Sequence, residues 1–330
     1  MVISTTSSRF AQMRELKLGT IASNLLRDLG LPLLGIAIFL LVWQGAASQV
    51  HTSLGQFPGP AQVLVQAKGL YAEYREDQER EAAFYVRQNK RNADRLAEDP
   101  KFVADAIRPY TGKPTFFKQI GTSLKTVFTG FLLASLIAIP VGIAIGLSGN
   151  LYSAINPLIQ LFKPISPLAW LPLVTIVVSA LYATEDGGVP KSYITSSITV
   201  MMCSLWPTLL NTAVGVTSVS SDLVNVSRVL RLNWLRHVRS IVLPASVPMI
   251  FTGLRLSLST AWMVLIAAEM LAQNPGLGKF VWDEFQNGSS DSLGRIMVAV
   301  LTIGFIGYVL DRCMLQCQRW VSWDKQAVQR

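Results

Sequence analysis

Long uncharged stretches fill the middle of the chain. No residue within 126–162, 164–184 or 192–221 carries a charge. A helix needs about 20 mostly apolar residues to cross roughly 30 Å of hydrocarbon, and a soluble helix would interrupt such stretches with a solvated face. The pattern predicts an all-α polytopic membrane protein with six spans, at 31–47, 117–147, 158–181, 195–214, 247–271 and 295–315.

The segment between the first two predicted spans differs from the rest. It contains a dense run of acidic and basic residues from 68 to 101, in which Leu70, Tyr74, Asp77 and Phe84 recur at helical spacing. Alternating charges of this kind are typical of a solvated helix with ion pairs along it. Two interpretations stay open: a spacer or cap on the bundle, or a docking surface for an external partner.

Composition supports a membrane protein, because 51% of the residues are hydrophobic and 15% are charged. Of the 29 basic residues behind the net charge of +9, 12 lie in clusters at 9–27, 228–239 and 312–330, outside the uncharged stretches. That is how cytoplasmic segments of membrane proteins are marked, and we expect both termini in the cytoplasm. Bases and aromatic residues are not interleaved as in a nucleic-acid-binding platform, so we expect no nucleic-acid partner.

The chain lacks the motifs of common catalytic sites. Gly276-Leu-Gly-Lys279 does not have the spacing of a nucleotide-binding P-loop. A nucleophile elbow and a cluster of metal ligands are also missing, and the only histidines are His51 and His237. We therefore expect no catalytic residue, no metal and no cofactor in this chain, which leaves a pore, a carrier or a membrane anchor.

Between the fourth and fifth predicted spans lies a basic amphipathic segment, 222–245. Leu223, Val226, Val229, Leu230 and Trp234 fall on one helical face. The dipeptide at 243–244, Leu-Pro, is expected to stop this helix. Such a helix lies on a membrane surface or inserts into a groove on another protein.

This segment resembles the cytoplasmic loop of ABC importer permeases, which has the form Glu-Ala-Ala, three residues, Gly, nine residues, Ile-x-Leu-Pro. Residues 225–227 stand at Glu-Ala-Ala and Arg231 at Gly, while Ile241, Leu243 and Pro244 match the end. The chain departs from the pattern at the Glu and Gly positions. The resemblance covers about 117–321 and implies that the loop is a coupling helix docking on an ATPase subunit.

Further stretches look like the nitrate/sulfonate/bicarbonate branch of these permeases, at 58–60, 123–131, 163–172, 253–258 and 267–283. The last of them is most similar to nitrate permeases. The resemblance implies a type I ABC importer permease that moves nitrate or nitrite by alternating access; sulfonate or taurine, bicarbonate and cyanate stay open. It also implies four partners: ATPase subunits that bind ATP-Mg, a second permease copy, an extracytoplasmic binding protein and membrane lipids.

The same resemblance divides the chain into five parts. These are a cytoplasmic segment 1–30, a first span 31–48, an extracytoplasmic loop 49–116, a permease core 117–321 and a cytoplasmic tail 322–330. The expected ATPase-coupling residues are Asn225, Val226, Ser227, Arg228, Val229, Leu230, Arg231, Leu232, Trp234, Arg236, Leu243 and Pro244. For the arginines, attraction to lipid headgroups is an equal alternative.

Polar residues inside predicted spans are candidates for the substrate pathway, because they are costly in a membrane. These candidates are Lys125, Lys163, Trp206, Asn211, Arg255 and Glu269. The alternatives are snorkelling or pairing between helices for the charged residues, and packing or kinking for Trp206 and Asn211. A transporter or channel that works without ATP, and a membrane anchor for soluble enzymes, remain the competing hypotheses.

Overall fold

The computed structural model describes residues 30–52, 55–99, 108–182 and 188–321, which are mostly helical. Most of the predicted N-terminal segment and the predicted tail lie outside these residues. Within these ranges, five helices are long and apolar enough to cross a membrane: α2 (Leu31–Gln49), α4 (Phe116–Leu147), α7 (Lys191–Thr217), α10 (Leu243–Ala272, which continues the stretch from Trp234) and α12 (Ser292–Val321). Each contains the whole of the apolar stretch from which it was predicted, so these five helices are confirmed.

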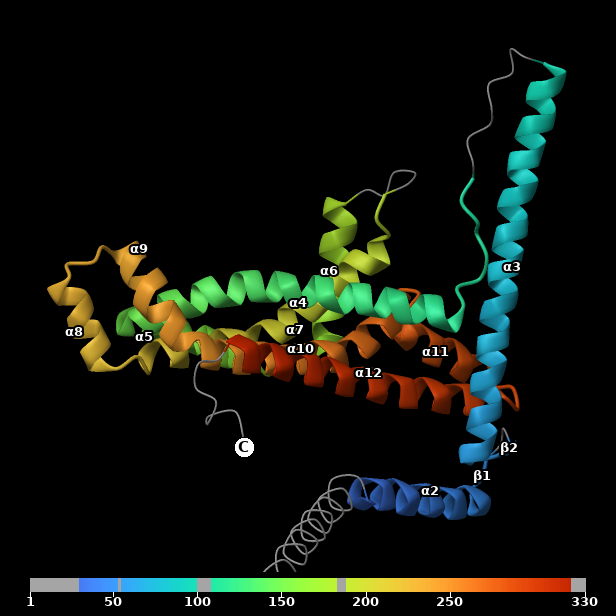
Figure 1. Cartoon of the computed structure of the whole chain (residues 1–330), viewed down its shortest axis with the longest axis horizontal. Coiled ribbons are helices and arrows are strands. Elements are labelled where there is room, and N and C mark those ends of the chain that lie inside the picture. The colour runs from blue at the N-terminus through green and yellow to red at the C-terminus, as the bar shows by residue number, and fades with distance from the viewer. Residues whose placement is uncertain (1–29, 53–54, 100–107, 183–187, 322–330) are drawn as a thin grey trace, which may run out of the picture.

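Helix α7 forms the centre of the bundle, with α4 packed along one side and α10 along another (Figure 1). The approach of α4 depends on two glycines. A Cβ on Gly142 would lie 2.7 Å from the Cβ of Thr212, and one on Gly146 would lie 2.6 Å from the Cβ of Val216. Small residues at this spacing let two helix backbones come close. Gly142 and Gly146 therefore pack α4 against α7 within one chain.

The predicted third span is not one helix. The segment forms α5 (Gly149–Phe162) and α6 (Pro167–Leu181), bent by 99° at a short break. Ser166 has an extended backbone, with φ −64° and ψ 144°, because the following Pro167 disfavours the helical conformation there. Pro164 lies in the same break and cannot donate a helical hydrogen bond. In Figure 1, α6 stands away from the long axis of the bundle.

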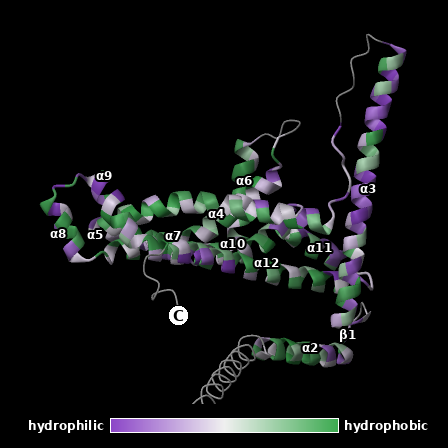
Figure 2. Cartoon of the chain, in the orientation of Figure 1, coloured by the Kyte–Doolittle hydropathy of each residue, from purple (hydrophilic) through white to green (hydrophobic). Residues whose placement is uncertain are grey.

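A charged helix, α3 (Pro60–Glu98), follows a short hairpin of β1 (His51–Thr52) and β2 (Gly55–Gln56). The helix predicted in this segment is thus confirmed, and it is the most hydrophilic helix in Figure 2. Its buried residues, Val63, Leu70 and Asp77, recur every seven positions and so lie along one face. Helix α3 crosses one end of the bundle, and its far half extends beyond it (Figure 1).

Polar contacts fix the base of α3 to the bundle. The Gln66 amide donates to Asp291 at 2.8 Å, near the start of α12. The Lys118 ammonium, in the first turn of α4, lies 2.8 Å from both Asp77 and Glu81. These contacts attach one half of α3 and set its direction across the bundle.

At the other end of the bundle are α8 (Ser221–Val229), α9 (Trp234–His237) and a π-helical turn, η2 (Val238–Val242), which leads into α10. The expectation that Leu243 and Pro244 stop the helix is wrong, because residues 234–272 are one helical stretch. Pro244 has no N–H to donate within this stretch, and it directly follows η2 and Leu243. The wider turn before it absorbs the change in hydrogen bonding.

One helix was not predicted at all. Helix α11 (Leu277–Asn287) lies between α10 and α12, near the base of α3. It starts after Gly276 and ends at Gly288, whose φ of 59° is in the left-handed region that glycine adopts readily.

Candidate coupling and transport sites

The coupling hairpin, which we define as residues 221–237, lies at the end of the bundle opposite α3 (Figure 1). Asp222 in the first turn of α8 and Arg228 in its last turn both complement the helix dipole. Helix α9 is capped by Asn233, whose side-chain oxygen accepts from the Arg236 N–H at 3.0 Å. Local sequence therefore defines both helices of the hairpin.

The turn between the two helices requires an unusual backbone conformation at Arg231. Its φ is 44°, in the left-handed region where glycine is favoured. The Arg231 N–H donates to the Arg228 carbonyl and the Leu232 N–H to the Ser227 carbonyl, each at 3.1 Å. Arg231 stands where the resemblance places the motif glycine. Arg231 therefore adopts a backbone conformation that favours glycine, at the position where the family motif has glycine.

Ser227 and His237 join the two arms of the hairpin. Ser227 is buried, and its Oγ lies 2.8 Å from Nδ1 of His237. Ser227 was expected among the contact residues, but it faces His237 within the hairpin. His237 was missed, because no sequence rule pairs two residues ten positions apart across a turn.

The outer surface of the hairpin is apolar and exposed. The exposed fractions are 82% for Val229, 63% for Leu230 and 65% for Trp234. A shallow depression of about 420 Å³ lies beside them, lined by Asp222, Asn225, Val226, Val229 and Leu230. The charged residues of the hairpin that are exposed at its surface include Arg228, Arg231 and Arg236. An apolar patch with a basic rim is typical of a protein-binding surface.

Three other predicted coupling residues contribute less to this surface. Leu232 is half-buried in the turn. Leu243 is also half-buried, and it begins α10 together with Pro244, after η2. Leu243 and Pro244 therefore belong to the spanning helix α10.

The pathway candidates are spread over several helices. Arg255 of α10 forms a two-pronged ion pair with Asp311 of α12, at 2.6 and 2.8 Å. Its guanidinium is thus engaged between helices, as the pairing alternative predicted. Lys163 is exposed at the break between α5 and α6, and Lys125 is exposed on α4.

Glu269 of α10 is fully buried. Its carboxylate accepts from the Ser123 hydroxyl of α4 at 2.8 and 2.9 Å and from the Gly278 N–H of α11 at 3.0 Å. The Ser123 oxygen in turn accepts from the Leu277 N–H at 2.8 Å. Glu269 therefore holds the N-terminus of α11 against α4, and α11 is positioned by this network.

Trp206 and Asn211 of α7 have structural contacts. The Asn211 amide donates to the Pro207 carbonyl at 2.8 Å. The Trp206 ring stacks almost parallel on Phe162, with centroids 6.5 Å apart. Both contacts support the packing and kink alternatives. Within the described ranges, hydrogen bonds and ion pairs do not join the six pathway candidates into one site.

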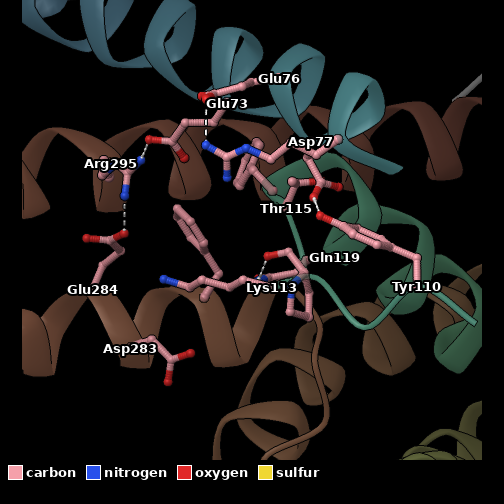
Figure 3. A pocket seen from close by; sticks show the side chains of 14 residues that line it. Glu73, Glu76, Asp77, Tyr110, Lys113, Thr115, Gln119, Asp283, Glu284 and Arg295 are labelled. Carbon is pink, nitrogen blue, oxygen red and sulfur yellow. Dashed lines mark hydrogen bonds and ion pairs between the residues drawn. The ribbon is translucent and has the colours of Figure 1, made fainter. Parts of the chain in front are cut away.

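A polar cavity of about 320 Å³ lies near the base of α3, where α4, α11 and α12 meet (Figure 3). Arg295 bridges Glu73 of α3 and Glu284 of α11 there. Tyr110 donates to Asp77 at 3.1 Å. Desolvation raises the pKa of Tyr110, and the bond to Asp77 raises it further. The cavity joins residues more than 200 positions apart, so sequence spacing could not reveal it.

Residues 130–322 match the family described as binding-protein-dependent transport system inner membrane component. This match spans more than half of the chain, and the chain belongs to that family of ABC importer permeases. Membership implies a multi-pass protein of the inner membrane that works with ATPase and substrate-binding partners.

Its relatives include two cyanobacterial permeases. The bicarbonate transport system permease protein CmpB of Synechococcus elongatus is 34% identical over 292 residues, 88% of each chain. The nitrate import permease protein NrtB of a Synechocystis species is 34% identical over 281 residues, 85% of each chain. The expected nitrate/sulfonate/bicarbonate branch is therefore confirmed.

Comparison with solved structures supports the fold. An inward-facing structure of the MetNI methionine ABC transporter has a TM-score of 0.53 at 14% identity, over 63% of this chain and 96% of that one. The expected fold, that of a type I ABC importer permease, is confirmed.

Proposed function

We propose that the chain is the pore-forming, non-catalytic subunit of an importer for a small inorganic anion, with nitrate or nitrite as the first candidate. Relatives named for nitrate import support this substrate class. Bicarbonate is the second candidate, because a relative named for bicarbonate transport is equally identical over a slightly larger share of the chain. Nitrate, nitrite and bicarbonate are all small oxyanions with one negative charge.

The observation that carries the proposal is the exposed apolar surface of the coupling hairpin. Val229, Leu230 and Trp234 would be unfavourable in water, and a cleft on an ATPase subunit would bury them. Arg228 and Arg236 then contact the rim of that cleft. ATP-Mg is bound by the ATPase subunits, so this chain needs no cofactor of its own.

The proposal also sets the orientation. With the coupling hairpin in the cytoplasm, both termini lie on that side, and α3 lies outside the membrane where a binding protein docks. Two copies of the chain enclose the pathway. Lipids cover apolar residues of α2 and α6 such as Leu41 and Ile176, which are largely exposed in a single chain.

The test is reconstitution of the permease with its ATPase subunits and cognate binding protein in proteoliposomes. ATP supplied on the side of the membrane where the ATPase subunits lie should drive uptake of nitrate or nitrite. Omission of ATP should abolish this uptake. Bicarbonate, cyanate and taurine are the comparison substrates, each with its own binding protein. Uptake that persists without ATP, while the membrane potential is held, would assign the chain to the secondary transporters instead.

A further inference from the structure

One face of α4 is exposed and largely apolar, and Lys125 lies on it. Phe128, Leu132 and Leu136 are exposed along this face, and Lys125 is exposed one turn before them. Lys125 directly precedes the uncharged stretch 126–162. It therefore lies at the outer end of the part of α4 that crosses the hydrocarbon, on the side where α3 is attached.

Three other cations at this end of the bundle are paired with carboxylates. Lys118 is paired with Asp77, Lys279 with Asp283, and Arg295 with two glutamates. Lys125 has no carboxylate partner among the residues that the structure describes. Its ammonium lies 5.4 Å from the centre of the Tyr193 ring, which attracts the cation without cancelling its charge.

Tyr193 is itself held in place. Its hydroxyl lies 2.5 Å from Oγ1 of Thr129, one turn after Lys125 on α4. Thr129 also bonds to the Lys125 carbonyl at 2.9 Å. Tyr193 is in the first turn of α7, which has Lys191 and no acidic residue. The positive end of the α7 dipole thus adds to the charge of Lys125.

We propose that Lys125, positioned by Tyr193, binds the transported oxyanion at the outer end of the pathway. The inference rests on the proposed function and identifies a contact residue for it. An ammonium offers three N–H donors to an anion. One cation in a partly aqueous site binds weakly, as transport requires, since a strong site would trap the ion. Arg255 is unsuitable because Asp311 already occupies its guanidinium.

The test uses chemical rescue of charge in the reconstituted importer. Cys203, Cys313 and Cys317 are first replaced by alanine, and Lys125→Cys is added. We expect nitrate uptake to fall about fivefold or more, since a charge near the ion contributes at least about 1 kcal/mol at 4 Å even in water. Aminoethyl methanethiosulfonate, which restores an ammonium, should recover most of the uptake. The neutral methyl reagent and the anionic sulfonatoethyl reagent should not.

Nitrate should also slow the reaction of the cysteine with the aminoethyl reagent. This measurement distinguishes two possible ligands of Lys125, the transported ion and a lipid phosphate. Free nitrate would not displace a lipid phosphate from a lysine that snorkels to the membrane surface. The matched control is Lys90→Cys, at an exposed position on α3, where all three reagents should leave uptake unchanged.

The inference is overturned by a cysteine at position 125 that no aqueous reagent reaches, by equal rescue with the methyl and aminoethyl reagents, or by no protection by nitrate. If the unmodified importer moves nitrate and the Lys125→Cys variant moves it equally well, the inference alone fails. If the unmodified importer moves none of the tested anions, the proposed function fails with it.

Discussion

Serine at positions 229 and 230 of the coupling hairpin should weaken binding of the ATPase subunits by about two orders of magnitude. Val229 and Leu230 are 82% and 63% exposed. Full burial of such a side chain contributes about 1.5–3 kcal/mol, so the exposed fractions leave roughly 1–2 kcal/mol each for a partner to gain. The sum of about 3 kcal/mol corresponds to a change in Kd of about 150-fold.

The assay is titration of purified ATPase subunits onto the permease in nanodiscs, comparing the Val229→Ser, Leu230→Ser double variant with the unmodified chain. Val86→Ser is the control, because Val86 is also 65% exposed but lies on α3 at the other end of the molecule. An unchanged Kd in the double variant, or an equal loss in the control, would refute the assignment of the docking surface.

Two further predictions concern charge and packing. The double variant Arg228→Glu, Arg231→Glu reverses the charge at the rim of the hairpin surface. We expect this variant to stay in the membrane but to lose uptake. Substrate-stimulated ATPase activity equal to that of the unmodified importer would argue against coupling through this rim. Gly142→Ala should lower the free energy of unfolding by about 1–3 kcal/mol, because α4 and α7 must move apart. Gly304→Ala, with no atom within 4 Å of its Cβ, should leave the melting temperature in detergent unchanged or higher.

The spans were predictable because apolar length is a local property. The exceptions arose where several prolines compete with helix formation. Near Pro164 and Pro167 the helix breaks and turns by 99°, whereas at Pro244 it continues through a π-helical turn. Both sites contain proline in an apolar context, and the local sequence does not show at which of them the helix breaks. Helix α11 was missed because Ser123, which accepts from the Leu277 N–H, lies 154 positions away in the sequence.

The apolar residues predicted to share one helical face of the coupling hairpin are exposed, but they do not lie on one helical face, because α8 ends at Val229 and Trp234 begins α9. Sequence alone did not show that Arg231 keeps the glycine-like turn, since φ depends on hydrogen bonds such as that from Leu232 to Ser227. The sequence could not show which charged pathway candidates are paired. In the structure, Arg255 forms an ion pair with Asp311, while Lys125 lies against the ring of Tyr193.

The continuous stretch from Trp234 to Ala272 has a mechanical consequence. Its 39 residues measure about 58 Å at 1.5 Å each, enough to connect the hairpin on one side of the membrane with the Glu269 network on the other. A rigid rod of this length that pivots about its middle by roughly 5° shifts its two ends by about 2.5 Å in opposite directions. In the importer proposed above, displacement of the inner end by a bound ATPase would move the seat of α11 the other way, so that one mouth of the pathway would widen as the other narrows.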